Sequence, residues 1–176
     1  MDLAGAPLVG RIIERVSRVR KIDQIVLATS VLPKDNILID LSDRYNISHF
    51  RGSENDLVDR YFHAANKFEA DIILRLPADN PCPEPIEYDK LIDYHLSGGK
   101  DFSSNICCIM GNGYPDGIGV EAFSYSALKS IWEAERDPLK REHIGLNFYD
   151  YINDKMPISS IFSVGTIMCP PEYARP

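Results

Sequence analysis

Short apolar runs alternate with amphipathic stretches along the chain. Three runs in the first half have the length of a strand, at residues 24–29, 47–50 and 71–76. Near-continuous apolar runs of this kind are typical of parallel strands that are covered on both faces. Hydrophobic residues at helical spacing predict three helices between and before these runs, from Pro7 to residue 19, from 35 to 45 and from 55 to 68. Ser53 or Asn55 is the expected cap of the third helix.

The second half continues the alternation. A helix is expected over 84–96, ended by Gly98 and Gly99. Strand-like segments follow at 102–109, 120–124 and 158–164, and helices are expected over 126–135 and 140–153. Alternating strands and helices with long crossovers predict an α/β fold with a mostly parallel sheet. No repeat or linker divides the sequence, so residues 1–176 are expected to form a single domain.

Composition narrows the class of protein. The net charge of −7 and the pI near 5.1 argue against a partner that is a nucleic acid or a membrane surface. No apolar run approaches the length of a membrane-spanning helix, and the first residues do not have the pattern of a signal peptide. The four cysteines, which are Cys82, Cys107, Cys108 and Cys169, contain no C-x-x-C pair. We therefore expect a cytoplasmic protein without a zinc or redox motif.

Ligands of open parallel sheets bind beyond the carboxyl ends of the strands, so the loops at those ends are the candidate sites. Thr29 and Ser30 follow the first run, where their hydroxyls suit either a nucleotide contact or the cap of a turn. Arg51, Gly52 and Ser53 follow the second run at a helix entrance. Such an entrance offers N–H groups and a guanidinium to an anion, although many helix starts look alike.

A proline-rich loop follows the third run and contains Asp79. One carboxylate on a stiff loop suits Mg²⁺, which completes its shell with water and substrate phosphate oxygens. An Asx-turn explains the same residue without any ligand. Further along, a glycine-rich segment over 111–121 contains Asp116 and Glu121, which suit a ligand hydroxyl. A Pro-Asp-Gly turn accounts equally well for Asp116.

These segments together resemble one family. The segments in question are Leu3–Leu8, Ile25–Thr29, Phe50–Tyr61, Arg75–Pro81, Tyr114–Gly117 and Arg141–His143. In this order they resemble the cytidylyltransferase-like proteins of the spore-coat polysaccharide type, which are relatives of the synthetases of CMP-Kdo and CMP-neuraminate. The resemblance covers nearly the whole chain, and its most specific part is Phe50–Tyr61.

The resemblance implies a three-layer α/β/α fold of the nucleotide-diphospho-sugar transferase type, which is Rossmann-like. It implies transfer of a nucleotidyl group from CTP to a sugar with Mg²⁺ as cofactor, and a homodimer. Asp79 matches the metal-binding aspartate. Thr29, Arg51, Gly52, Ser53 and Arg60 match the nucleotide-binding segments, and Asp116 and Glu121 fall on the sugar side.

The sequence also departs from the family pattern. The family's first strand and phosphate-binding loop, and its C-terminal strand, have no counterpart here, and Gly119 stands where relatives often have an acidic residue. The first strand belongs between residues 24–29 and 71–76, so two apolar strand edges are expected either to meet or to stay unpaired. We therefore expect these 176 residues alone to bind CTP weakly or not at all, with negligible turnover.

Two alternatives to a sugar-activating cytidylyltransferase remain open at this point. One is a glycosyltransferase of similar fold that uses a nucleotide-sugar donor, although the sequence lacks the Asp-x-Asp motif that favours it. The other is a non-catalytic binding or dimerisation module.

Overall fold

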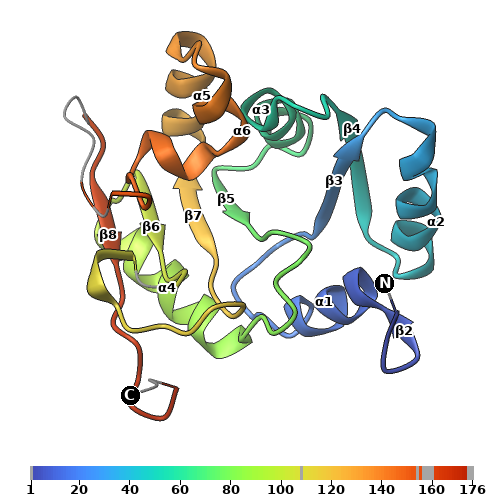
Figure 1. Cartoon of the computed structure of the whole chain (residues 1–176), viewed down its shortest axis with the longest axis horizontal. Coiled ribbons are helices and arrows are strands. Elements are labelled where there is room, and N and C mark those ends of the chain that lie inside the picture. The colour runs from blue at the N-terminus through green and yellow to red at the C-terminus, as the bar shows by residue number, and fades with distance from the viewer. Residues whose placement is uncertain (1, 108, 154, 156–160, 174–176) are drawn as a thin grey trace.

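The computed structural model describes residues 2–107, 109–153, 155 and 161–173. Its sheet is mixed and divided (Figure 1). Strands β3 (Val26–Ser30) and β4 (Ser48–Gly52) form a parallel pair, with Ala28 opposite Phe50. Strands β5 (Ile72–Arg75), β7 (Glu121–Ser124), β6 (Phe102–Ser104) and β8 (Val164–Thr166) form a second sheet in the order β5-β7-β6-β8. The pairs of β7 are antiparallel, whereas β6 and β8 are parallel.

Helices cover both faces of the larger sheet. Phe123 on β7 contacts the core formed with α3 (Leu57–Lys67) and α5 (Tyr125–Ala134). Its neighbour Ala122 belongs to the opposite core, under α4 (Pro85–Ser97). Because successive side chains of a strand point to opposite faces, this alternation makes three layers. The α/β/α arrangement that the family resemblance implied is therefore confirmed. The larger sheet is less parallel than expected, because β7 runs antiparallel to both of its neighbours.

The remaining elements are the N-terminal hairpin, the helices α1 and α2, and several short turns. Helix α1 (Leu8–Val16) follows a short hairpin of β1 (Asp2–Leu3) and β2 (Ala6–Pro7), which the hydrophobic pattern did not predict. A 3₁₀ turn η1 (Pro33–Asp35) leads into α2 (Asn36–Arg44) beside β3 and β4. The short elements η2 (Ile109–Gly111), α6 (Pro138–Glu142) and η3 (Ile144–Asn147) complete the described chain.

Three sequence-based predictions of local structure were wrong. The strand expected over 102–109 ends at Ser104, because the Ser104 hydroxyl accepts from the Ile106 amide and turns the chain. The helix expected over 140–153 breaks at His143, whose φ of −111° and ψ of 81° lie outside the helical region. The cap of α3 is Asp56, whose carboxylate accepts from the Asp59 amide.

The last predicted strand is only partly within the described residues. Residues 158–160 lie outside them, and the strand that the structure describes there, β8, begins at Val164. In the described part of the chain, no helix is long and apolar enough to cross a membrane.

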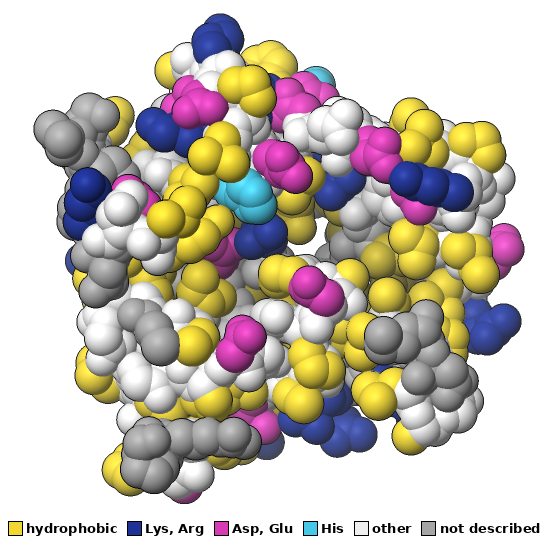
Figure 2. All heavy atoms as spheres, in the orientation of Figure 1, with side chains coloured by type: hydrophobic (Ala, Val, Ile, Leu, Met, Phe, Trp, Pro, Cys, Tyr) yellow, Lys and Arg dark blue, Asp and Glu magenta, His cyan; other side chains and the backbone are white. Residues whose placement is uncertain are grey.

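The two sheets do not join. No backbone hydrogen bond links β3 to β5 within the described residues, so the facing edges of these two strands have no ladder partner there. Of the two outcomes expected for these apolar edges, the structure has the unpaired one. The space-filling view shows the molecule hollowed at its centre (Figure 2).

Candidate functional site

A cavity with a volume of about 370 Å³ lies between the unpaired edges of β3 and β5. Apolar side chains of α1, β3 and β5 form most of its wall, among them Ile12, Val26 and Leu74. Its polar lining residues are Gln24, Arg60, Tyr61, Arg75 and Tyr88. Pro77 and Ala78, the first residues of the loop after β5, also line it. The cavity therefore combines an apolar interior with guanidinium groups.

Arg75 and Glu121 form the most buried ion pair at this cavity. They face each other across the ladder of β5 and β7, with 2.5 Å between Arg75 Nη1 and Glu121 Oε2. The Glu121 side chain is 2% exposed and the Arg75 side chain 18%. Burial acts against the charge of Arg75, but Glu121, together with Tyr61 and Tyr151, outweighs this effect, and the pKa of the guanidinium is raised. Arg75 is therefore cationic at every physiological pH.

Two neighbours confine the Glu121 carboxylate further. A methyl group at Gly145 would collide with Glu121 Oε1, so only glycine fits there without a shift. Tyr61 lies nearby and is half-buried, and desolvation of its hydroxyl raises the pKa of that group. The sequence reasoning named Glu121 but missed Arg75 as a site residue. The available signal was a charged residue within the apolar run Ile72-Ile73-Leu74-Arg75-Leu76.

Asp79 is exposed, on the loop that follows β5. That loop packs against the glycine-rich segment after η2, where Asp116 is also exposed. The Cys82 amide donates to the Gly117 carbonyl at 3.2 Å, and the Asn80 amide group donates to the Gly119 carbonyl at 3.3 Å. Two loops that are far apart in sequence are thereby held together, each with one exposed aspartate. The Asp116 carboxylate accepts from the Gly117 amide at 2.9 Å, as expected for a turn.

Gly119 fits its place because it has no side chain. A Cβ there would lie 2.5 Å from the carbonyl oxygen of Asn105 and 2.5 Å from Cα of Ile106. The Asn105 side chain also accepts from the Val120 amide at 2.8 Å. The space that an acidic side chain at position 119 requires is occupied by this backbone.

Arg51 and Thr29 pair across β3 and β4 but differ in their surroundings. The Arg51 guanidinium donates to the carbonyls of Ser30 and Leu32 and to the Asn36 side chain, each at 2.9 Å. It therefore holds the loop after β3 in place. Thr29 is 4% exposed, so its side chain lies within the protein.

Gly52, Ser53 and Arg60 lie together at the start of α3. A Cβ on Gly52 would lie 3.0 Å from Arg60 Cγ, so the Arg60 stem packs tightly against this glycine. Arg60 Nη1 donates to the Ser53 carbonyl at 3.0 Å, and the Ser53 hydroxyl accepts from the Asp56 amide at 3.0 Å. Nε of Arg60 and Nε of Arg75 are buried without a hydrogen-bond partner in the described part of the chain.

No cluster of three or more His, Cys, Asp or Glu side chains with the arrangement of a metal site occurs among the described residues. Asp79 therefore belongs to no such cluster in the described part of the chain. A carboxylate of this kind suits a cation that takes most of its ligands from water and substrate, and does not suit a structural zinc ion.

Comparison with known proteins decides the family. The model of the cytidylyltransferase family matches residues 1–156. The chain belongs to this family. The predicted family and the predicted fold are therefore confirmed, and the similar structure described next supports the nucleotide-diphospho-sugar transferase architecture.

The chain is also similar to three individual proteins. An uncharacterised protein of Methanocaldococcus jannaschii is 30% identical over 164 residues, which cover 93% of this chain and 62% of that protein. The spore coat polysaccharide biosynthesis protein SpsF of Bacillus subtilis is 33% identical over 81 residues, covering 46% of this chain and 34% of SpsF. A cytidylyltransferase structure from Leptospira borgpetersenii has a TM-score of 0.83 at 26% identity and covers 96% of this chain and 68% of that chain.

This cytidylyltransferase-family chain is shorter than these relatives. It spans 62% of the length of the Methanocaldococcus protein and 68% of the Leptospira chain.

Proposed function

We propose that this chain forms the core of an enzyme that activates a sugar with CTP for surface polysaccharide synthesis. Membership of the cytidylyltransferase family supports the nucleotidyl transfer, and the similarity to SpsF supports the polysaccharide context. The observation that carries the proposal is the polar set of cavity-lining residues. Two guanidinium groups, of Arg60 and Arg75, line the same cavity as the first residues of the Asp79 loop.

In the proposed reaction a sugar oxygen forms a bond to the α-phosphorus of CTP, and the bond from that phosphorus to pyrophosphate breaks. Negative charge on the phosphates must be neutralised while the reacting atoms stay in line. The buried Nε groups of Arg60 and Arg75 are donors without a protein partner in the described chain, so phosphate oxygens are suitable acceptors for them. Glu121 contributes by holding Arg75 in a fixed place.

Mg²⁺ fits the residues present. Asp79 offers one exposed carboxylate on a proline-stiffened loop, and magnesium needs one or two protein carboxylates when it also binds substrate phosphates. Asp79 is the residue that would hold it. The ion would supply charge neutralisation on the phosphates.

The other predicted site residues have distinct places in this proposal. Thr29, Arg51, Gly52 and Ser53 shape the two strand ends beside the nucleotide base, where Arg51 acts by holding the loop after β3. Asp116 is exposed and suits a contact with a sugar hydroxyl. A cytoplasmic homodimer is part of the same proposal, and light scattering in solution tests the dimer.

An NMR titration tests the proposed function because it detects weak ligands. We expect Mg²⁺ and CTP to shift the amide signals of residues 51–60 and 75–80, with a Kd of about 1 mM, which corresponds to about 4 kcal/mol. ATP and GTP at equal concentration should shift them less. The Asp79→Asn variant should lose the dependence on Mg²⁺ while staying folded, because Asp79 is exposed. Of the two outcomes expected for this chain alone, weak binding of CTP and none, the cavity and the two Nε groups, which face no protein acceptor among the described residues, favour weak binding. Absence of any CTP-dependent shift in these segments would therefore contradict the proposal.

A further inference from the structure

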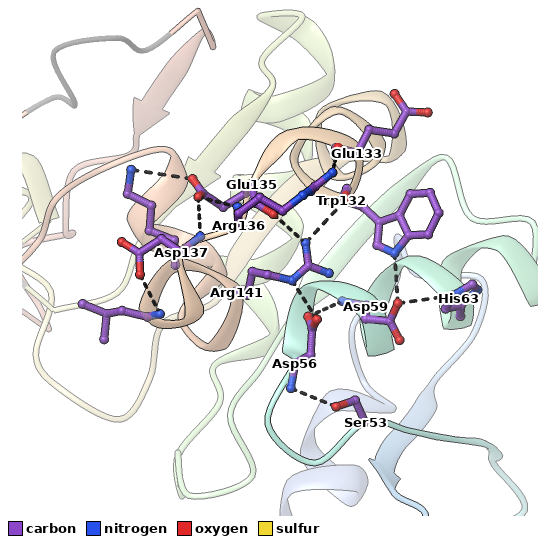
Figure 3. A network of polar contacts seen from close by, with 12 residues as sticks. Ser53, Asp56, Asp59, His63, Trp132, Glu133, Glu135, Arg136, Asp137 and Arg141 are labelled. Atoms are coloured by element: carbon purple, nitrogen blue, oxygen red, sulfur yellow. Dashed lines mark hydrogen bonds and ion pairs between the residues drawn. The ribbon is translucent and has the colours of Figure 1, made fainter.

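Arg141 lies at a junction between three helices (Figure 3). It is not among the residues that line the cavity between β3 and β5. Its Nε donates to Asp56 Oδ2 at 2.7 Å, and its Nη1 donates to the Glu135 carbonyl at 2.9 Å. Asp56 is the cap of α3, and Glu135 is the residue at the C-terminal end of α5. We propose that Arg141 is a positioning residue, which fixes the segment between β4 and α3 for binding of the nucleotide.

Asp56 transmits this contact to the predicted nucleotide-binding residues. Its Oδ1 accepts from the Asp59 amide at 2.9 Å, so its two carboxylate oxygens serve α3 and Arg141 separately. Its own amide donates to the Ser53 hydroxyl at 3.0 Å. The Ser53 carbonyl in turn accepts from Arg60 at 3.0 Å. A continuous series of hydrogen bonds therefore leads from Arg141 to the guanidinium at the cavity.

Burial and charge make the Arg141–Asp56 contact firm. The side chains are 16% and 31% exposed, so the pair is shielded more than most surface ion pairs. The C-terminal end of a helix carries partial negative charge, and the Arg141 guanidinium also meets the carbonyls at the end of α5. The guanidinium is therefore held by α5 while it restrains Asp56.

Neighbouring contacts join the same helices without reaching Ser53. The Trp132 indole donates to Asp59 Oδ1 at 3.0 Å and its ring stacks on Phe62. The guanidinium of Arg136, five residues before Arg141, donates only to the carbonyls of Glu133 and Glu135 among the described residues. Trp132 stabilises the junction between α3 and α5, whereas Arg141 reaches the segment before α3. Variants of Trp132 and Arg141 therefore distinguish an effect on stability from an effect on the position of the segment before α3.

This inference rests on the proposed function and is tested with the same NMR titration on the whole chain. We expect Arg141→Ala to lower the initial slope of the CTP-induced shifts at residues 51–60 by about tenfold, which is the effect of one lost hydrogen-bonded charge contact. Amide exchange at residues 53–56 should become faster in the same variant. Arg141→Lys should restore part of the slope, because a lysine keeps the charge near Asp56 but not the second donor.

Three further variants decide the interpretation. Arg136→Ala should titrate as the parent chain does, and Trp132→Phe should lower the thermal midpoint with an unchanged CTP slope. Asp56→Asn is the substitute test in case Arg141→Ala does not fold. It keeps an acceptor for the Asp59 amide but removes the charge that holds Arg141, so it should lower the CTP slope as expected for Arg141→Ala. Parent-like slopes in both Asp56→Asn and folded Arg141→Ala would overturn the positioning role alone. A parent chain that shows no CTP response would overturn the proposed function, and the positioning role with it.

Discussion

Replacing Arg75 by methionine should destabilise the protein strongly, because it leaves the Glu121 carboxylate buried without its counter-charge. Glu121 is 2% exposed, and the backbone near Gly145 closes its other side. Breaking a buried pair by removing one partner costs about 3–5 kcal/mol. Because Arg75 itself is 18% exposed, we expect a loss near the lower end, about 3 kcal/mol.

Removing the other partner of the pair, Glu121, should cost less stability. In Glu121→Gln the remaining guanidinium is partly exposed and reaches water, so we expect a loss of about 1–2 kcal/mol. In the double variant the buried charge and its partner are both gone. Its loss should stay well below the sum of the two single losses, because the single Arg75→Met variant already includes the cost of an unpaired Glu121.

Urea denaturation followed by circular dichroism measures these losses. At about 2–4 °C per kcal/mol, Arg75→Met should also lower the thermal midpoint by about 6–12 °C. Lys129→Met is the matched control, since the pair of Lys129 with Glu133 is 4.0 Å long and its side chains are 52% and 56% exposed. The control should lose less than about 1 kcal/mol. The reasoning would be refuted if Arg75→Met also lost less than about 1 kcal/mol of unfolding free energy. It would equally be refuted if the loss in the double variant equalled the sum of the two single losses.

Three other predictions follow from buried or unfilled places in the fold. His95 is 1% exposed and hydrogen-bonded to Ser103, and burial lowers its pKa. The unfolded chain therefore binds a proton near pH 6.5 that the folded chain does not bind, so stability should fall as the pH drops below about 6.5. Urea denaturation across pH should show a less steep fall in His95→Asn. Gly119→Ala should destabilise by about 1–3 kcal/mol in the same assay, because its Cβ meets backbone that a rotamer change does not move. The open apolar cavity should bind the dye ANS in the folded state. The fluorescence of bound ANS should be weaker in Ala28→Phe, which fills the cavity, than in Ala134→Phe, which changes an exposed position. Equal fluorescence in the two variants would show that the cavity is not the dye site.

Local pattern predicted most of the secondary structure. The stripe of Val58, Phe62 and Ala65 predicted α3, and these residues are buried in the core as a helical spacing requires. The errors arose where side chains bond to the backbone of residues close in sequence. Ser104 ends β6 in this way, and Asn147 donates to the carbonyls of Lys140 and Ile144 beyond the broken helix. Such contacts compete with regular structure and leave the hydrophobic pattern unchanged.

The candidate site was predictable in part. Arg60, Asp79, Asp116 and Glu121 lie in segments that the sequence singled out, because strand ends can be located from apolar runs. Arg75 was missed, because a charge on a strand acquires its meaning only when the neighbouring strand is known. Register pairs it with Glu121, which is 46 residues away along the chain.

The sequence by itself determined the alternation of strands and helices, the family and the loops that carry polar groups. The alternation and the loops could be read from it because burial periodicity and turn chemistry are local properties. The family followed from the resemblance of ordered motifs, which the match of the family model confirms. Only the tertiary structure decided that the edges of β3 and β5 stay unpaired around a cavity and that Glu121 neutralises Arg75. Only the tertiary structure brought Arg141 to the cap of α3. These features depend on which distant segments meet, and that is set by packing of the whole chain.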